Sequence, residues 1–147
     1  MILPDFKDFV ANLPSKGRLI GIDWGARRIG IAVSDDDRGF AFPRGIAESI
    51  EKIKELIVAE KIVGIIIGLP LHIDGTDSET TRSVREFAGH LAAQGSMPIG
   101  FIEENLTSME AGERQKAEGR RQKELDSESA AIILENAIAM IKRVQNV

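Results

Sequence analysis

The chain has 147 residues and 43% hydrophobic content, which predicts one globular domain with a buried core. It lacks cysteine, which excludes disulfide bonds and thiolate metal sites and favours a reducing cytoplasm. No apolar run is long enough for a membrane span, and the net charge of −4 disfavours a surface devoted entirely to nucleic acid, although basic residues cluster locally.

The first predicted elements are a helix and a hairpin. Residues 1–17 have apolar side chains at near-helical spacing and are expected to form an amphipathic helix outside the main domain, which spans 18–147. Residues 19–36 carry two apolar runs around a Trp-Gly-Ala-Arg-Arg turn, which is typical of a β-hairpin. Residues 39–48 predict a third strand ending near Pro43, a residue best tolerated at a sheet edge.

Helices and strands then alternate. Isoleucines at helical spacing predict a helix from Ile46 to about Glu60, and the unbroken apolar run 62–70 predicts a strand buried on both faces. A turn at Asp74 precedes another amphipathic helix, and residues 98–105 predict the last strand.

The closing part of the chain is expected to be helical, apart from a charged loop over residues 113–124. One helix is predicted to start at Thr107 and another at Asp126. The whole order favours an α/β fold with a five-stranded mixed sheet, in which three antiparallel strands precede the parallel ones and helices cover both faces.

Carboxylates occupy positions from which they can meet at one edge of such a sheet. Asp23 interrupts the first strand, and Glu103 and Glu104 end the last one. Asp126 lies in the first turn of the closing helix, on the same side as the apolar residues that face the core. The carboxyl ends of parallel strands share an edge, so these acids can converge there. Converging acids repel one another unless a cation holds them, and Mg²⁺ or Mn²⁺ prefers oxygen ligands. The pattern therefore favours metal-dependent cleavage of a phosphodiester.

Each acid also has a structural interpretation. Asp23 would end its strand by bonding the turn, and Asp126 would be a helix N-cap. One of the two glutamates must face away, because neighbours on a strand point to opposite faces. Asp74 either makes its Asp-Gly turn or serves as a fourth ligand. The two histidines match no metal-ligand spacing.

Basic residues near the acids are candidates for substrate binding. Arg27 and Arg28 lie in the hairpin turn and Arg114 in the charged loop, and together they would hold a phosphate backbone if both segments flank the acids. Thr107 is either a helix cap or a further substrate-binding group.

Several motifs match a known family in the same order. GIDWGARRIGIAVSD resembles the opening signature of the YqgF family of bacterial RNase H-like nucleases, and GLPLHIDGTDSETTRSVREFA resembles its second signature. EENLTSMEA and LDSESAAIILENA resemble the third and fourth, so the likeness extends from Leu19 onward. It implies an RNase H-like fold and a metal-dependent nuclease that matures the 5′ end of pre-16S rRNA. The family was earlier named for its similarity to Holliday-junction resolvases.

The resemblance also implies site residues. The catalytic and metal-binding acids would be Asp23, Glu104 and Asp126, and the choice of Glu104 over Glu103 comes from the motif. The family usually has Asp-Glu-Arg-Leu where this chain has Glu-Glu-Asn-Leu, so one arginine contact is lost unless another arginine replaces it.

Other functions fit part of the pattern. A DNA endonuclease for four-way junctions would be a homodimer, since two symmetric cuts need two sites. For a nuclease acting on pre-rRNA or on a precursor ribosomal particle, the sequence leaves monomer and homodimer open. A ribosome-assembly or nucleic-acid-binding module without activity would fit the missing arginine and the net negative charge. An actin-like or sugar-kinase ATPase shares similar first strands but generally needs a second domain, for which this chain leaves no room.

Overall fold

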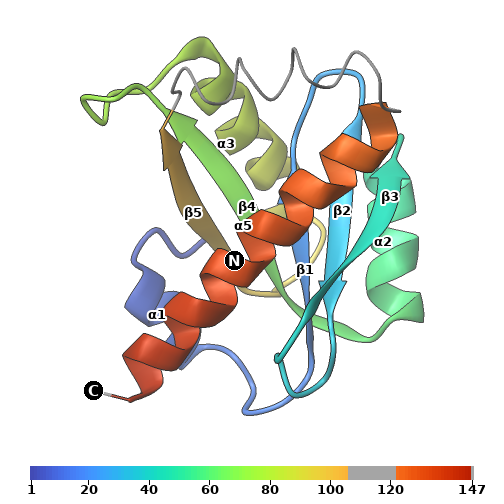
Figure 1. Cartoon of the computed structure of the whole chain (residues 1–147), viewed down its shortest axis with the longest axis vertical. Helices are drawn as coiled ribbons and strands as arrows, with labels where there is room; N and C mark the ends of the chain where they lie inside the picture. Colours follow the sequence, from blue (N-terminus) through green and yellow to red (C-terminus); the bar gives the residue numbers. More distant parts are fainter. Residues whose placement is uncertain (106–121, 147) are drawn as a thin grey trace.

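Five strands form one mixed sheet in the order β3-β2-β1-β4-β5 in the computed structural model, which describes residues 1–105 and 122–146 (Figure 1). The strands are β1 (Arg18–Asp23), β2 (Ile29–Ser34), β3 (Ala41–Ala47), β4 (Ile62–Leu71) and β5 (Ile99–Asn105). The first three strands pair antiparallel, whereas β4 runs parallel to β1 and β5 parallel to β4. The predicted α/β class and strand pattern are confirmed, and they are those of an RNase H-like fold.

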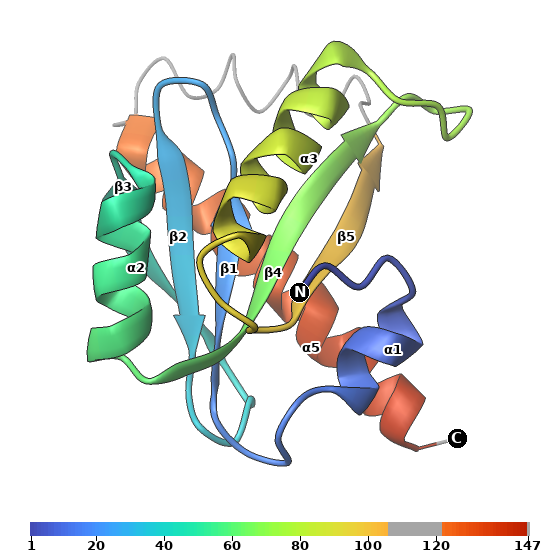
Figure 2. The same cartoon turned by 180° about the vertical axis from the view of Figure 1, so that it is seen from behind.

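Helices cover both faces of this sheet (Figures 1 and 2). The helices are α1 (Phe6–Ala11), α2 (Ile50–Ala59), α3 (Glu79–Ala92) and α5 (Gln122–Gln145). Residues of α2 and α3 share one core with Ile20 and Ile22 of β1, and residues of α1 and α5 share the other core with Leu19. Alternation along each strand therefore decides which helix layer a strand residue meets. Among the helices described, none is long and apolar enough to cross a membrane.

Helix α5 contributes the apolar stripe that its sequence predicts. The stripe residues are all buried, and they are Ala130, Ile133, Leu134, Ala137 and Ile141. The predicted start at Asp126 is wrong, because α5 already includes Gln122, and residues 122–124 are helical instead of part of a loop. Charged and amide side chains of this kind have good helix propensity, so polarity alone does not end a helix. The predicted helix start at Thr107 lies outside the described residues.

The N-terminal residues are only partly helical. Asp5 caps α1 by accepting a hydrogen bond from the Lys7 backbone N–H, so the helix begins at Phe6. Ile2, predicted to lie on the helix, instead forms a parallel bridge with Ile99 of the edge strand β5. The edge strand offers unpaired backbone groups to this extended segment, which outweighs the helical spacing of its apolar residues.

Strand β3 continues past Pro43 to Ala47, so the predicted end near Pro43 is wrong. Because β3 is an edge strand, the missing proline N–H removes little from the ladder. The register of β2 and β3 shifts between Gly30 and Ala32, and Gly45 has φ +80°, so this edge carries an irregularity. Ile46, predicted to be helical, belongs to β3, and α2 starts at Ile50.

Replacing Gly89 with alanine should stabilise the protein. Gly89 lies within α3, and a Cβ atom there would meet nothing within 4 Å. Alanine loses less backbone entropy than glycine on entering a helix, so we expect the free energy of unfolding to rise by about 0.5–1 kcal/mol. Urea denaturation measures the change, and a lower midpoint for Gly89→Ala would contradict it.

Candidate active site

Two of the predicted acids stand at the same edge of the sheet. Strands β1, β4 and β5 are parallel, and β4 lies between the other two. Asp23 is the last residue of β1, and Glu104 lies near the end of β5, level with Pro70. Ile22 is level with Ile67, so continuing this register places Asp23 beside Gly68. The acids therefore flank the carboxyl end of β4, as the parallel arrangement predicts.

Both acids belong to the face that α5 covers. Gly21 lies under α5, because a Cβ on it would be 2.8 Å from Leu134 Cβ, and Asp23 follows in the same alternating row. The Glu104 side chain reaches toward Gly68, where an added Cβ would lie 3.3 Å from Glu104 Oε2. Gly68 thus lies between Asp23 and the carboxylate of Glu104. Glu103 is exposed, and strand alternation turns it toward the opposite face.

Helix α5 brings Asp126 to the same end of the sheet. A Cβ on Gly30 would lie 2.0 Å from the carbonyl oxygen of Asp126 and 3.2 Å from its Cα atom. Gly30 is the register partner of Asp23, so the backbone of Asp126 passes directly over the strand beside Asp23. Asp126 is partly buried and lies inside α5, so the N-cap interpretation is wrong. The structure thus brings all three acids to one edge and one face.

Strand glycines make this close approach of α5 possible. Gly21, Gly30 and Gly68 all lie beneath α5, at positions where a Cβ would come within 3 Å of an α5 atom. Sequence reasoning did not single out these residues. A glycine inside an apolar strand pattern is nevertheless a usable signal, because it often marks a site of close backbone approach.

The described residues do not include three His, Cys, Asp or Glu side chains grouped closely enough to hold a metal ion. Asp23, Glu104 and Asp126 each make interactions of their own. Three carboxylates from three separate elements nevertheless fit a hard divalent cation in donor chemistry, since Mg²⁺ takes oxygen ligands.

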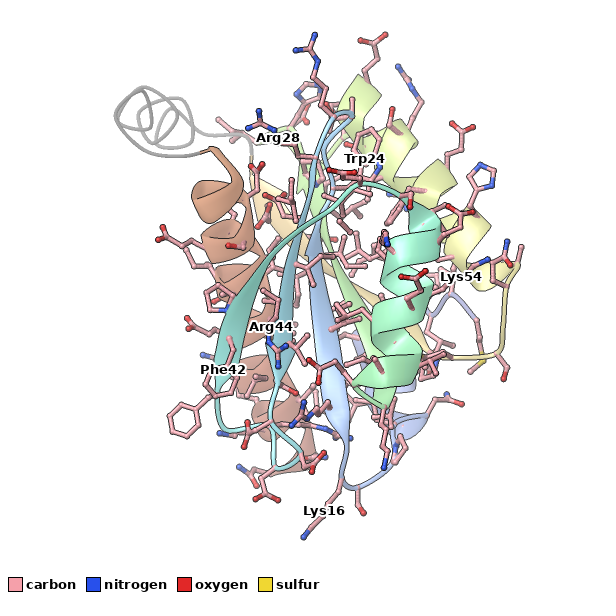
Figure 3. The ribbon with its side chains drawn as sticks, turned by 90° about the vertical axis from the view of Figure 1, so that its right-hand side faces the viewer. Lys16, Trp24, Arg28, Phe42, Arg44 and Lys54 are labelled. Atoms are coloured by element: carbon pink, nitrogen blue, oxygen red, sulfur yellow. The ribbon has the colours of Figure 1, made fainter. Side chains whose placement is uncertain are left out.

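The arginines of the β1–β2 turn lie at the same end of the molecule. Arg27 and Arg28 are exposed, and Figure 3 shows Arg28 near Trp24, at the opposite end from Lys16. Trp24 is half-buried and packs on Phe87 of α3 with ring centroids 6.4 Å apart, which anchors the turn. The turn therefore presents positive charge beside the acids. The other predicted substrate-binding residues, Thr107 and Arg114, lie outside the described residues.

Asp74 makes the Asp-Gly turn that its sequence indicates. The backbone N–H and hydroxyl of Thr76 donate hydrogen bonds to Asp74 Oδ1 at 3.0 and 2.6 Å. These bonds lower the pKa of the Asp74 carboxyl by stabilising its charged form. Asp74 is exposed and engaged in this turn, which gives no support to a role as a fourth ligand. His72 and His90 are exposed as well.

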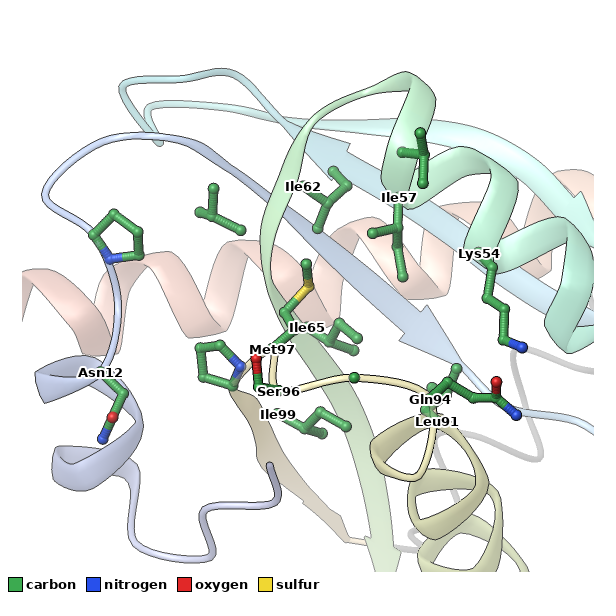
Figure 4. A pocket seen from close by; sticks show the side chains of 15 residues that line it. Asn12, Lys54, Ile57, Ile62, Ile65, Leu91, Gln94, Ser96, Met97 and Ile99 are labelled. Carbon is green, nitrogen blue, oxygen red and sulfur yellow. The ribbon is translucent and has the colours of Figure 1, made fainter.

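A cavity of about 660 Å³ lies at the other end of the sheet (Figure 4). Its walls come from the segment after α1, the end of α2, the α3–β5 loop and the amino ends of β4 and β5. Mainly apolar side chains line it, with Lys54 and Gln94 among its polar groups, and none of its described lining residues is acidic. This cavity is therefore separate from the acidic edge, and no sequence pattern predicted it.

Known proteins resemble this chain over almost its whole length. The sequence profile of the RuvX family, described as Holliday junction resolvase, matches residues 17–140. A relative from Maridesulfovibrio salexigens is 41% identical, over 83% of this chain and 98% of its own length. One from Sphingopyxis alaskensis is 36% identical, over 97% and 100% respectively, and both bear the name "Putative pre-16S rRNA nuclease". The family resemblance inferred from the motifs is confirmed, and the chain belongs to the RuvX/YqgF family.

Proposed function

We propose that this protein is a cytoplasmic, Mg²⁺- or Mn²⁺-dependent nuclease that hydrolyses phosphodiester bonds at the 5′ end of pre-16S rRNA. The observation that carries the proposal is the position of Asp23, Glu104 and Asp126 at one edge and on one face of the sheet. The names of the relatives support rRNA as the substrate. A precursor ribosomal particle would then present the RNA.

The three carboxylates would hold the cation. Asp23 and Glu104 lie on β1 and β5, which both pair with β4, and Asp126 lies on α5, which packs against the sheet. Their backbones are therefore fixed relative to one another. A bound divalent ion would supply Lewis acidity that stabilises charge on the attacking and leaving oxygens of the phosphodiester.

Arginines would bind and orient the RNA backbone. Arg27 and Arg28 are exposed at the acidic edge, where their charge offsets the repulsion between carboxylates and phosphates. Guanidinium groups match phosphate oxygens in a two-pronged geometry, which would fix the direction of the strand across the edge. Thr107 and Arg114 would add further substrate contacts.

Cleavage assays with two substrates test this proposal. Purified protein and Asp23→Asn are incubated with a 5′ fragment of pre-16S rRNA or with a four-way DNA junction, each with Mn²⁺, Mg²⁺ or EDTA. We expect the wild type to cut the RNA only with metal, and Asp23→Asn to be inactive because a neutral amide is a weaker cation ligand than a carboxylate. Cleavage in EDTA, or full activity of Asp23→Asn, would overturn the assignment.

A junction-cutting DNA endonuclease is the second candidate, and the description of the matching family favours it. Such an enzyme needs two sites for symmetric cuts, so it would be a homodimer in solution. Junction cleavage together with a dimeric mass would replace the RNA assignment. Nucleic-acid binding without cleavage of either substrate would favour an assembly factor.

A further inference from the structure

The segment between β4 and α3, residues 72–77, projects from the edge where the acids lie (Figures 1 and 2). We call it the finger. The His72 N–H donates to Thr76 O at 3.0 Å, and the Gly75 N–H donates to His72 O at 2.8 Å. At the base, Leu71 forms an antiparallel bridge with Asp77. The finger is therefore a closed, hydrogen-bonded turn with a defined direction.

The base of the finger is anchored next to the site. The buried hydroxyl of Thr81, in the first turn of α3, donates to the carbonyl of Pro70 and accepts a hydrogen bond from the Ser78 N–H at 2.8 Å. Pro70 is level with Glu104 in the sheet. These bonds fix the point from which the finger leaves β4, one strand away from a proposed metal-binding carboxylate.

Ile73 gives the finger an exposed apolar group. Its side chain is 77% exposed. Both carboxylates of the finger are already engaged. Asp74 is bound by Thr76, and Asp77 pairs with Arg85 Nη2 at 3.1 Å. Covering an exposed branched apolar side chain with a partner lowers the free energy of the complex, because apolar surface leaves water.

Arginines lie near this apolar group, together with the two aspartates of the finger, and Arg85 is the partner of Asp77. Arg82 and Arg85 are exposed on the first turns of α3, next to the base of the finger. Arg27 and Arg28 lie at the same edge in the β1–β2 turn, on the side of β1 away from β4. The finger leaves β4 between the strands that carry Asp23 and Glu104, and it reaches past the end of β5 in Figures 1 and 2. A nucleic-acid strand laid along this edge from the β1–β2 turn would therefore meet the acids and then the end of the finger. Apolar wedges flanked by arginines are the means by which many proteins unstack nucleic-acid bases.

We infer that Ile73 inserts between two stacked bases of the nucleic-acid substrate and so delivers an unstacked phosphodiester to the acidic edge. The inference rests on the proposed function and adds how the substrate is shaped there. Its occupant is nucleic acid, because the apolar tip extends from the edge that carries Arg27, Arg28 and a candidate phosphodiesterase site. Ile73 would act as a positioning residue that contacts bases and takes no part in the chemistry.

Fluorescence of a base analogue tests this role. A pre-16S rRNA 5′ fragment carries 2-aminopurine, which brightens when unstacked, at successive positions around the cleaved bond, and Ca²⁺ replaces Mg²⁺ during binding. We expect wild-type protein to brighten one position. Ile73→Ser should remove that signal and weaken binding about tenfold, in the range for losing the burial of one branched apolar side chain. Ile73→Phe, which keeps a large apolar side chain, should retain both the brightening and the wild-type affinity.

Val58→Ser is the matched control. Val58 is 78% exposed, nearly the same as Ile73, but it lies at the end of α2 beside the distant cavity. It should bind and brighten the RNA like the wild type. Equal brightening and affinity in Ile73→Ser and wild type would overturn the role of Ile73 alone. A wild-type protein that neither binds nor cuts RNA would overturn the proposed function and this inference together.

Discussion

Glu104→Gln should lose nearly all cleavage activity, whereas Glu103→Gln should cut as fast as the wild type. The two glutamates are neighbours on β5, but strand alternation turns only Glu104 toward α5, where its Oε2 atom approaches Gly68. A glutamine keeps the shape and removes the charge that would hold a cation. We expect the single-turnover rate of Glu104→Gln to fall by roughly 100-fold or more, the usual loss when one electrostatic group of an active site is removed.

Metal binding separates this role from a structural one. Mn²⁺ should raise the melting temperature of the wild type and of Glu103→Gln, since a ligand that binds only the folded state stabilises it. It should raise that of Glu104→Gln much less. The melting temperatures of both variants without metal separate the loss of interactions that Glu104 already makes from the loss of metal binding. Equal loss of activity in Glu103→Gln and Glu104→Gln would contradict the assignment of the catalytic role to the glutamate that faces α5.

Gly30→Ala should destabilise the fold strongly and disturb the site. The new Cβ atom would lie 2.0 Å from the carbonyl oxygen of Asp126, and a backbone atom cannot move aside unless α5 moves with it. We expect the free energy of unfolding to fall by about 3 kcal/mol, at the upper end for overpacking a core. The midpoint of urea denaturation measures this loss.

Activity provides the second measurement on Gly30→Ala. Displacing α5 would move Asp126 away from Asp23, so cleavage should drop even at temperatures where the variant is fully folded. Gly89→Ala is the control, because it adds the same methyl group in open space. A Gly30→Ala protein as stable and active as the wild type would mean that α5 does not need its present distance from β2.

The sheet could be predicted because its physical signals are local and strong. Apolar alternation and the unbroken run of β4 identified strands, and the parallel direction of β1, β4 and β5 followed from the intervening helices. That direction alone brings Asp23 and the end of β5 to one edge. The choice between Glu103 and Glu104 was beyond such reasoning, because alternation requires them to differ but does not say which one faces α5.

Other features depend on tertiary packing that a local pattern does not report. The pairing of Ile2 with Ile99 joins parts of the chain that are remote in sequence, and the helical spacing of Ile2 concealed it. The start of α5 lies in a polar stretch of the sequence, where no apolar stripe marks the helix. The exposure of Ile73 depends on the hydrogen bonds that orient its turn, whereas the Asp-Gly pair in the sequence predicts only that a turn is present.

The order in which the chain is synthesised has a consequence for when activity begins. Asp23 is made early, but Asp126 belongs to α5, which follows all five strands and covers one sheet face together with α1. Until that helix leaves the ribosome, the growing polypeptide has an uncovered apolar sheet and an incomplete set of acids. Because the proposed site includes Asp126, cleavage would begin only after α5 has packed on the sheet. A truncation that removes α5 would leave an inactive product with an exposed apolar sheet face, which favours aggregation.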